Sequence, residues 1–567
     1  MTFINSTCLD RNIPDECHEK LKSFINGGHR IIWVAFPPGG GNSWSVITDK
    51  TFFNRGIPDE CHQKMKEFFN AGHKLLCVAF PPAGGNSWSL ITDKTFFNRG
   101  IPDECHQKMK GFFNAGHKLL SVAFPPAGGN SWSLITDKTF FNRGIPDECH
   151  QKMQELSAAG TKLFAVGFPK AGGNRWSLVG DKAFFNRAIS GECHRVMRAM
   201  TSSGLGPLRV TAFHPGGGFV VVTKGDALFV NHPPLKMANE SFSLTAFADN
   251  IRNQLAGKGC KYALMVRYGP AIRTATDGPK RTTKSPPAED FTVFDWFNPA
   301  SVAKTVTGVV LLQLLEKKNL TIAEKIYKHL PSSWTIGPSL NTITVTELLN
   351  HTSGFRSGAT AYDDLRTMVE AGIKLADKVP KYQNCNYALA RIVAAYINGN
   401  DESKPDQAKV TSENFIGLAQ KNVFDRLAIP GVQWKPDADA PTLFYPTPPG
   451  NSTGTAYGDW SLKPGSAGSH LSIGELSEFV NGLASGNLLL SSTMRTQMDA
   501  NGLGWGKVED VEKGWYYRKR GYFPPGQNGG AELNSGIWKF STGVQAVVLH
   551  NGSPEVNMPI AYNDAWS

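Results

Sequence analysis

A long hydrophobic run is missing from this sequence. A helix that spans a membrane needs about 18 or more consecutive apolar residues, and the longest candidate, from Ser301 to Leu315, is interrupted by Lys304 and Gln313. The chain also begins without the apolar segment that a secretory signal contains. We therefore expect no membrane partner, and we expect a signal peptide to lie outside this chain if the protein is secreted.

A dense basic stretch is missing as well, although the net charge of the 567-residue chain is +11. Lysine and arginine are spread over repeating positions, whereas proteins that bind nucleic acids concentrate them on one face or in one run. We expect no nucleic-acid partner, and weak attraction to acidic polymers is the milder interpretation of the charge. The length corresponds to two or three globular domains.

Cysteine is scarce, and its nine residues cannot all pair with one another. Equivalent cysteines in repeated units are more often small buried side chains than a disulfide framework. The adjacent pair Cys61-His62 has no second pair of ligands one helical turn away, and the glycine runs lack the Lys-Ser/Thr of a phosphate-binding loop. We therefore expect neither a metal site nor a cofactor. Five of the cysteines recur at intervals of 44 residues: Cys17, Cys61, Cys105, Cys149 and Cys193.

The same period of 44 residues defines five tandem copies of one unit, from residue 12 to about residue 230. Each unit is predicted to contain one helix followed by two strands. In the second copy the two strands are predicted over residues 75–80 and 88–92. Because an α-β-β unit cannot bury its apolar face alone, we expect the copies to form a curved sheet or half-barrel with helices on one side. A tryptophan recurs in four copies, and we expect it to pack between repeats, with an exposed binding stripe as the alternative.

Composition changes at His232-Pro233-Pro234, which is typical of a linker. We therefore predict a tandem-repeat domain of unknown ligand over residues 1–234 and a second domain over residues 235–567. The second domain contains the segment in which Ser301 and Lys304 lie three residues apart at the start of a predicted helix. That spacing places the two side chains on one face, one turn apart.

Serine and lysine need each other for catalysis. A serine hydroxyl is a poor nucleophile until a base removes its proton, and lysine, with a pKa of about 10.4, is a poor base while it is charged. Lowering that pKa to roughly 7 corresponds to about 4 kcal/mol, which burial and a nearby cation can supply. The pair alone is a weak signal, because chance matches are frequent.

Further segments follow in a specific order. Residues 348–355 read Leu-Leu-Asn-His-Thr-Ser-Gly-Phe, Tyr382-Gln383-Asn384 follows, and a closing strand is predicted over residues 544–551. Together with the Ser-x-x-Lys segment, this order resembles the β-lactamase and penicillin-binding serine hydrolases over residues 241–567. The resemblance implies an α+β fold, in which an antiparallel sheet is flanked by helices beside an all-helical region.

The resemblance also implies roles for individual residues. Ser301 would attack the carbonyl carbon, Lys304 would take its proton, and Tyr382, with a pKa depressed by Lys304, would pass a proton to the leaving group. Asn384 would position the substrate and Lys304. The backbone N–H groups of Ser301 and Ala531 would form the oxyanion hole.

The third motif of this family is Lys-Thr-Gly, or His-x-Gly in some relatives, and the corresponding segment here is taken as Gln527-Asn528-Gly529-Gly530. Asn528 would then stand where a cation or an imidazole usually grips a substrate carboxylate. This departure argues against a penicillin-inactivating or strict carboxypeptidase role. Asn528, Gly529 and Gly530 are instead expected to position an extended peptide that binds as an added strand.

The combination of repeats and hydrolase resembles the fungal polyglycine hydrolases, and similar repeats also precede such domains in bacterial proteins. This resemblance implies a secreted serine endopeptidase that cuts Gly-Gly bonds in glycine-rich linkers of partners such as plant chitinases. An esterase or D-amino-acid peptidase is the alternative, and a binding protein with a relic hydrolase domain is a third possibility. The oligomeric state stays open. Four sequons are candidate glycosylation sites: Asn5, Asn239, Asn319 and Asn451.

Overall fold

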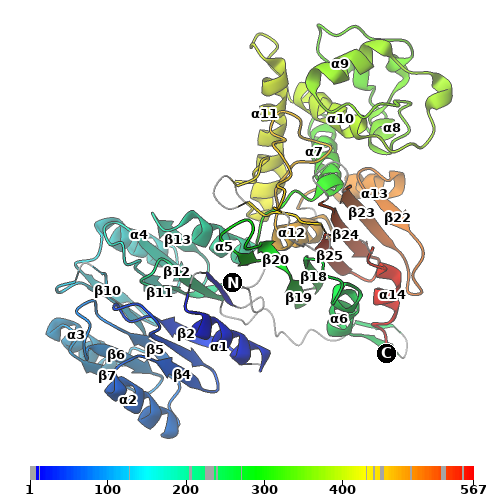
Figure 1. Cartoon of the computed structure of the whole chain (residues 1–567). Helices are drawn as coiled ribbons and strands as arrows, with labels where there is room; N and C mark the ends of the chain where they lie inside the picture. Colours follow the sequence, from blue (N-terminus) through cyan, green and yellow to red (C-terminus); the bar gives the residue numbers. More distant parts are fainter. Residues whose placement is uncertain are drawn as a thin grey trace. The chain divides into compact units, whose positions relative to one another are not determined.

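The computed structural model describes residues 8–11, 13–27, 29–126, 128–202, 207–223, 235–237, 240–269, 271–429, 431–437, 441–446, 453–484, 488–524, 531–551 and 555–567. It divides into two compact units, Met1–Val230 and Asn231–Ser567. The first unit begins in blue in Figure 1, and the second ends in red.

Each repeat of the first unit contains a helix and an antiparallel sheet. In the second copy, α2 (Asp59–Asn70) is followed by β5 (Leu75–Ala79), β6 (Trp88–Thr92) and β7 (Phe96–Arg99), with β6 in the middle. The helix begins after a proline and carries two acidic residues in its first turn, which complement the positive end of the helix dipole. The predicted helix and two strands are confirmed. The third strand was missed because four residues are too few to show a clear period of two.

The other copies repeat this order. The first has α1 (Asp15–Asn26), β2 (Ile31–Ala35), β3 (Trp44–Thr48) and β4 (Phe52–Arg55). The third has α3 (Asp103–Asn114), β8 (Leu119–Ala123), β9 (Trp132–Thr136) and β10 (Phe140–Arg143). The fourth has α4 (Asp147–Ala158), β11 (Leu163–Gly167), β12 (Trp176–Gly180) and β13 (Phe184–Arg187). The fifth has α5 (Gly191–Ser202), β14 (Leu208–Phe213) and β15 (Phe219–Thr223).

The start of the chain completes the fifth copy. Strand β1 (Cys8–Arg11) pairs with β15 and supplies the third strand of that sheet. The first strands of successive copies contact one another in the order β2, β5, β8, β11 and β14, and β14 contacts β2. The repeats therefore form a closed ring of five separate sheets, where the sequence predicted one curved sheet or half-barrel. No local pattern shows this closure, because the pairing of β1 with β15 joins residues about 200 positions apart.

The recurring tryptophans pack inside this ring. Trp44, Trp88, Trp132 and Trp176 are at most 1% exposed, and each stacks on a phenylalanine of its own sheet, as Trp88 does on Phe97 at 5.3 Å between ring centres. An exposed tryptophan stripe is excluded, and the predicted packing between repeats is confirmed for Trp176, which shares a core with Ile135 of the third copy. The cysteines are also buried. Cys149, for example, packs with Met153 of α4 against strands of the third and fourth copies.

The second unit is built on a six-stranded antiparallel sheet in the order β19-β18-β25-β24-β23-β22. Its strands are β18 (Tyr262–Tyr268), β19 (Ala271–Asp277), β22 (Gly506–Val508), β23 (Tyr516–Phe523), β24 (Leu533–Phe540) and β25 (Val544–His550). Two short hairpins accompany it: β16 (Leu235–Met237) with β17 (Glu240–Phe242), and β20 (Pro279–Arg281) with β21 (Glu289–Asp290).

Helices cover both faces of this sheet. On one face, α6 (Leu244–Leu255) and α14 (Met558–Asn563) pack on apolar side chains such as Leu264 and Val548. Helix α12 (Ile473–Ala484) contacts β18, β24 and β25, and its Glu478 pairs with Arg267 on the opposite face. The sheet is therefore buried on both sides near its centre.

Most of the remaining helices form the helical region in green and yellow in Figure 1. Helix α7 (Ala303–Lys317) is buried at nearly every position and contacts α10 (Asn384–Ile397) and α11 (Gln407–Ala419). The other helices are α8 (Val345–Leu349), α9 (Tyr362–Ala371) and α13 (Ser492–Asn501). Short helical turns are η1 (Ala300–Val302), η2 (Ile326–His329), η3 (Leu340–Thr342), η4 (Leu375–Asp377), η5 (Gln420–Phe424) and η6 (Asp425–Leu427).

The predicted α+β class is confirmed for the chain. Among the described residues, none of the helices combines the length and the apolar character that a membrane span requires.

Candidate active site

Ser301 lies in the turn η1, directly before α7 begins. Ala300, the preceding residue, has a φ of 49°, which is unfavourable for a residue with a side chain and is held in place by its surroundings. The carboxamide oxygen of Asn298 accepts hydrogen bonds from the backbone N–H groups of Ala300 (3.0 Å) and Gly468 (3.3 Å). Ser535 of β24 donates to the carbonyl of Pro299 at 2.7 Å. The turn that presents the nucleophile is therefore tied to both the sheet and the helical region.

Lys304 is completely buried, and its Nζ has three oxygen neighbours. It lies 2.9 Å from Ser301 Oγ, 2.9 Å from Asn384 Oδ1 and 2.7 Å from the carbonyl oxygen of Ser466. Burial, with a further contribution from the charge of Lys519, lowers the pKa of Lys304 well below its ordinary value. The neutral amine has two protons and one lone pair.

This arrangement decides where the lone pair of Lys304 points. The carbonyl oxygens of Asn384 and Ser466 can only accept hydrogen bonds, so the two amine protons go to them. The lone pair then faces the hydroxyl of Ser301, the one neighbour of the three that can donate a proton. Lys304 is thus arranged as the general base for Ser301.

Tyr382 approaches the nucleophile from the other side. Its hydroxyl donates to Ser301 Oγ at 2.5 Å, while 52% of the residue remains exposed to the cleft. Burial of the hydroxyl end raises the pKa of Tyr382, and the hydrogen bond to Ser301 opposes this only in part. The sequence predicted a depressed pKa from the charge of Lys304, and this prediction was wrong because burial keeps that amine neutral. Tyr382 therefore keeps its proton and is suited to act as a general acid.

His351 supports Tyr382, a relationship that the sequence motif did not show. The centres of the two rings lie 4.5 Å apart. His351 Nδ1 accepts from the backbone N–H of Gln383 (3.3 Å) and is 3.1 Å from Asn386 Nδ2. Burial lowers the pKa of His351 to about 3, and the charge of Lys519 acts in the same direction. The imidazole is therefore a neutral ring that fixes the position of Tyr382.

A second lysine, Lys519 on β23, completes the cluster. Its Nζ lies 5.2 Å from the centre of the Tyr382 ring, and burial lowers the pKa of Lys519 to about 8. Two residues further along the same strand, Gly521 faces the nucleophile, and a Cβ there would lie 2.2 Å from the Pro299 oxygen and 3.0 Å from Ser301 N. Lys519-Arg520-Gly521 thus has the Lys-x-Gly form of the third motif.

The assignment of that motif to Asn528 was therefore wrong, because Lys519 occupies the place of the cation. Asn528, Gly529 and Gly530 lie outside the described residues. Ala531, expected to supply an oxyanion donor, is buried at the approach to β24, and it is not among the described residues that line the cleft. The strand next to Ser301 N is β23 at Gly521. Asn319 is exposed, whereas Asn5, Asn239 and Asn451 lie outside the described residues.

The β-lactamase family model matches residues 248–559, which is more than half of the chain. This chain belongs to the β-lactamase family. Members of this family are serine hydrolases.

Several solved structures are similar to this β-lactamase-family chain. FmtA from Staphylococcus aureus is 16% identical with a TM-score of 0.44, over 59% of this chain and 93% of that chain. A D-stereospecific amidohydrolase from Streptomyces sp. is 18% identical with a TM-score of 0.40, over 54% and 94%. D-alanine carboxypeptidase AmpC from Burkholderia cenocepacia is 14% identical with a TM-score of 0.43, over 57% and 99%. No curated protein matches the chain.

The catalytic cleft of this β-lactamase-family protein has an empty volume of about 1020 Å³. Arg520 and Glu555, which both line it, form an ion pair. Strand β22 pairs only with Tyr516, Tyr517 and Arg518 of β23, so in the described residues the rest of β23 is paired on one side only. The described lining residues are Ser301, Tyr382, Asn384, Arg520, Tyr522, Glu532, Asn534 and Glu555. Arg520 and Tyr522 lie on β23, Asn534 lies on β24, and Glu532 directly precedes β24. The sequence did not predict these four residues because the third motif was assigned to the wrong segment.

Proposed function

We propose that this protein is a serine endopeptidase that hydrolyses Gly-Gly bonds in glycine-rich protein segments through an acyl-enzyme on Ser301. The observation that carries the hydrolytic part is the set of three oxygen neighbours around Lys304, which directs its lone pair at the Ser301 hydroxyl. The resemblance of the whole chain to the polyglycine hydrolases supports the choice of substrate.

Each proton transfer in the proposed reaction can be assigned to a named residue. Lys304 takes the hydroxyl proton as Ser301 Oγ attacks the carbonyl carbon, and the oxygen that becomes negative accepts hydrogen bonds from Ser301 N–H and from a backbone N–H of β23 next to Gly521. Tyr382 then gives its proton to the leaving amine, and Lys304 returns the first proton to Tyr382. A water molecule repeats the sequence in reverse to release the acyl group.

The open edge of β23 supports an extended peptide as the substrate. Beyond Arg518 this strand has no second neighbour among the described residues, so its backbone groups can pair with a peptide in the cleft. Gly521 leaves no side chain between that edge and the nucleophile. A glycine-rich peptide can approach the strand closely because it carries no side chains of its own.

Lys519 favours a second candidate function. A cation beside Tyr382 is suited to bind a substrate carboxylate, which supports a carboxypeptidase or D-amino-acid peptidase that acts at a free C-terminus. Because Lys519 is a cation at this place, the expected absence of one cannot favour an endopeptidase. The carboxypeptidase therefore requires a free C-terminus on its substrate, whereas the endopeptidase does not.

A pair of peptides separates them. An oligoglycine with an acetylated N-terminus and an amidated C-terminus should be cut internally, and mass spectrometry should report products that differ by whole glycine residues. The matched peptide has a free carboxylate, and Ser301→Ala is the enzyme control. If only the peptide with the free carboxylate is cut, and from that end, the protein is a carboxypeptidase and not an endopeptidase. If neither peptide is cut but a small ester is hydrolysed, the protein is an esterase.

We further propose that the enzyme is secreted and that its partners are secreted proteins with glycine-rich linkers, such as plant chitinases. The exposed sequon at Asn319 is compatible with a glycoprotein. Digestion of a purified chitinase with a glycine-rich linker, followed by mass spectrometry of the fragments, tests the partner. Cuts outside the linker would contradict it.

A further inference from the structure

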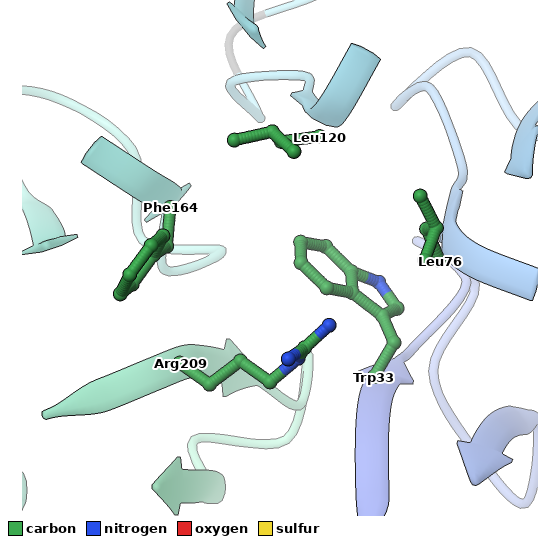
Figure 2. A pocket seen from close by; sticks show the side chains of 5 residues that line it. All are labelled: Trp33, Leu76, Leu120, Phe164 and Arg209. Carbon is green, nitrogen blue, oxygen red and sulfur yellow. The ribbon is translucent and has the colours of Figure 1, made fainter. Parts of the chain in front are cut away.

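The ring of sheets in the first unit surrounds a cavity that side chains of all five copies line. Each of its described lining residues comes from the first strand of a different copy. Figure 2 shows their side chains converging from β2, β5, β8, β11 and β14. They are Trp33, Leu76, Leu120, Phe164 and Arg209.

The lining residue is not the same in every copy. The second and third copies differ at two positions only, and both place a leucine in the cavity. The fourth copy has Phe164 at the equivalent position, the fifth has Arg209, and the first contributes Trp33. A ring that had only to fill its axis could use the same aliphatic residue in every copy. Its cavity instead combines two aromatic rings, two leucines and one cation.

Both polar members of the lining are held in position. Arg209 Nε donates to the carbonyl of Ile32 at 2.8 Å, and Trp33 Nε1 donates to the carbonyl of Val78 at 2.9 Å. These hydrogen bonds link neighbouring copies and orient the guanidinium and the indole. In Figure 2 the guanidinium of Arg209 points toward Trp33, into the space between the five strands.

We infer that this cavity binds a small organic anion with a flat apolar body, of which an aromatic carboxylate is the simplest form. The aromatic part would lie against Trp33 and Phe164, between the two leucines. The carboxylate would pair with Arg209, whose planar guanidinium matches its geometry. This site belongs to the repeat unit and does not depend on the function of Ser301.

Isothermal titration calorimetry of the full chain with 2-naphthoate tests this inference. We expect one naphthoate per chain and at least tenfold weaker binding of the neutral 2-naphthamide. Arg209→Leu, which introduces the residue of the second and third copies, should weaken naphthoate binding at least tenfold and leave the weak binding of the amide unchanged. A wild-type chain that does not bind naphthoate, or that binds the amide equally well, would overturn the inference.

Two further variants separate this site from other causes. Lys519→Met removes the cation beside Tyr382 and should leave naphthoate binding unchanged. Weaker naphthoate binding by Lys519→Met would show that the anion binds near the catalytic residues and not in the ring. Leu120→Phe introduces the residue of the fourth copy and reduces the cavity without removing charge. It should weaken naphthoate binding at least tenfold while the Tm of the unliganded protein stays close to that of the wild type. Unaltered binding in a folded Leu120→Phe variant would also contradict the site.

Discussion

Lys519 lies 5.2 Å from the centre of the Tyr382 ring, so the catalytic cluster contains two lysines of different environment. Lys304 is inaccessible to solvent, whereas Lys519 is partly accessible on an open strand. The charge of Lys519 contributes to the low pKa of Lys304, after burial. One lysine therefore helps to keep the other in the form that can accept a proton.

This coupling predicts a pH effect. Lys304 is a base only when it is neutral, so kcat/KM rises as pH increases through its pKa. Removing the charge in Lys519→Met raises the pKa of Lys304, and the acidic limb of the profile should move to higher pH. Ester hydrolysis should therefore fall more at about pH 6 than at about pH 8. Lys507→Met, on the neighbouring strand β22 and paired with Glu509, is the control, and a profile of Lys519→Met that matches it would contradict the coupling.

Gly521 is predicted to be irreplaceable. A Cβ in Gly521→Ala would come within 2.2 Å of the Pro299 oxygen, so the turn that carries Ser301 must shift. We expect kcat to fall about 10²-fold, as misplacement of a nucleophile by an ångström can cause. Gly506→Ala on β22 is the matched control, because its Cβ would meet nothing within 4 Å. Ester kinetics of the two variants decide the point, and equal rates would show that the strand tolerates a side chain at Gly521.

His351 is predicted to act through the position of Tyr382. His351→Phe keeps a ring but removes the Nδ1 acceptor, so the N–H groups that point at it lose their partner. We expect kcat to fall about tenfold with little change in KM. His351→Asn retains an acceptor and tolerates the φ of 65°, so it should recover part of kcat. If both variants have a lower Tm but the kcat of the wild type, the histidine has only a structural role.

The two units should respond separately to a core substitution. Trp132 is fully buried in the ring, and Trp132→Ala should cost about 3–5 kcal/mol of the free energy of unfolding of that unit. Calorimetry should show a lower Tm for one transition, while ester hydrolysis by the second unit continues. Phe113→Ala serves as the control because 39% of Phe113 is exposed. Loss of ester hydrolysis in a folded Trp132→Ala variant would show that the units depend on each other.

Local spacing and composition were enough for several conclusions about this chain. The 44-residue period, the helix and two strands of each copy and the burial of its tryptophans follow from residues that are close in sequence. The spacing of Ser301 and Lys304 likewise needs only the pitch of a helix, and the structure brings both next to Tyr382 and Asn384. Each of these inferences uses distances along the chain that a helix or strand converts directly into distances in space.

Contacts between distant segments decided the rest. Only packing shows that β1 closes the ring with β15 and that one side chain from each copy meets in a common cavity. Packing also shows that Lys519, and not Asn528, stands in the place of the cation, beside Tyr382. The neutral state of Lys304 likewise arises from elements about 80 and 160 residues away that bury its amine. These features depend on which surfaces meet, and no pattern within a single segment contains that information.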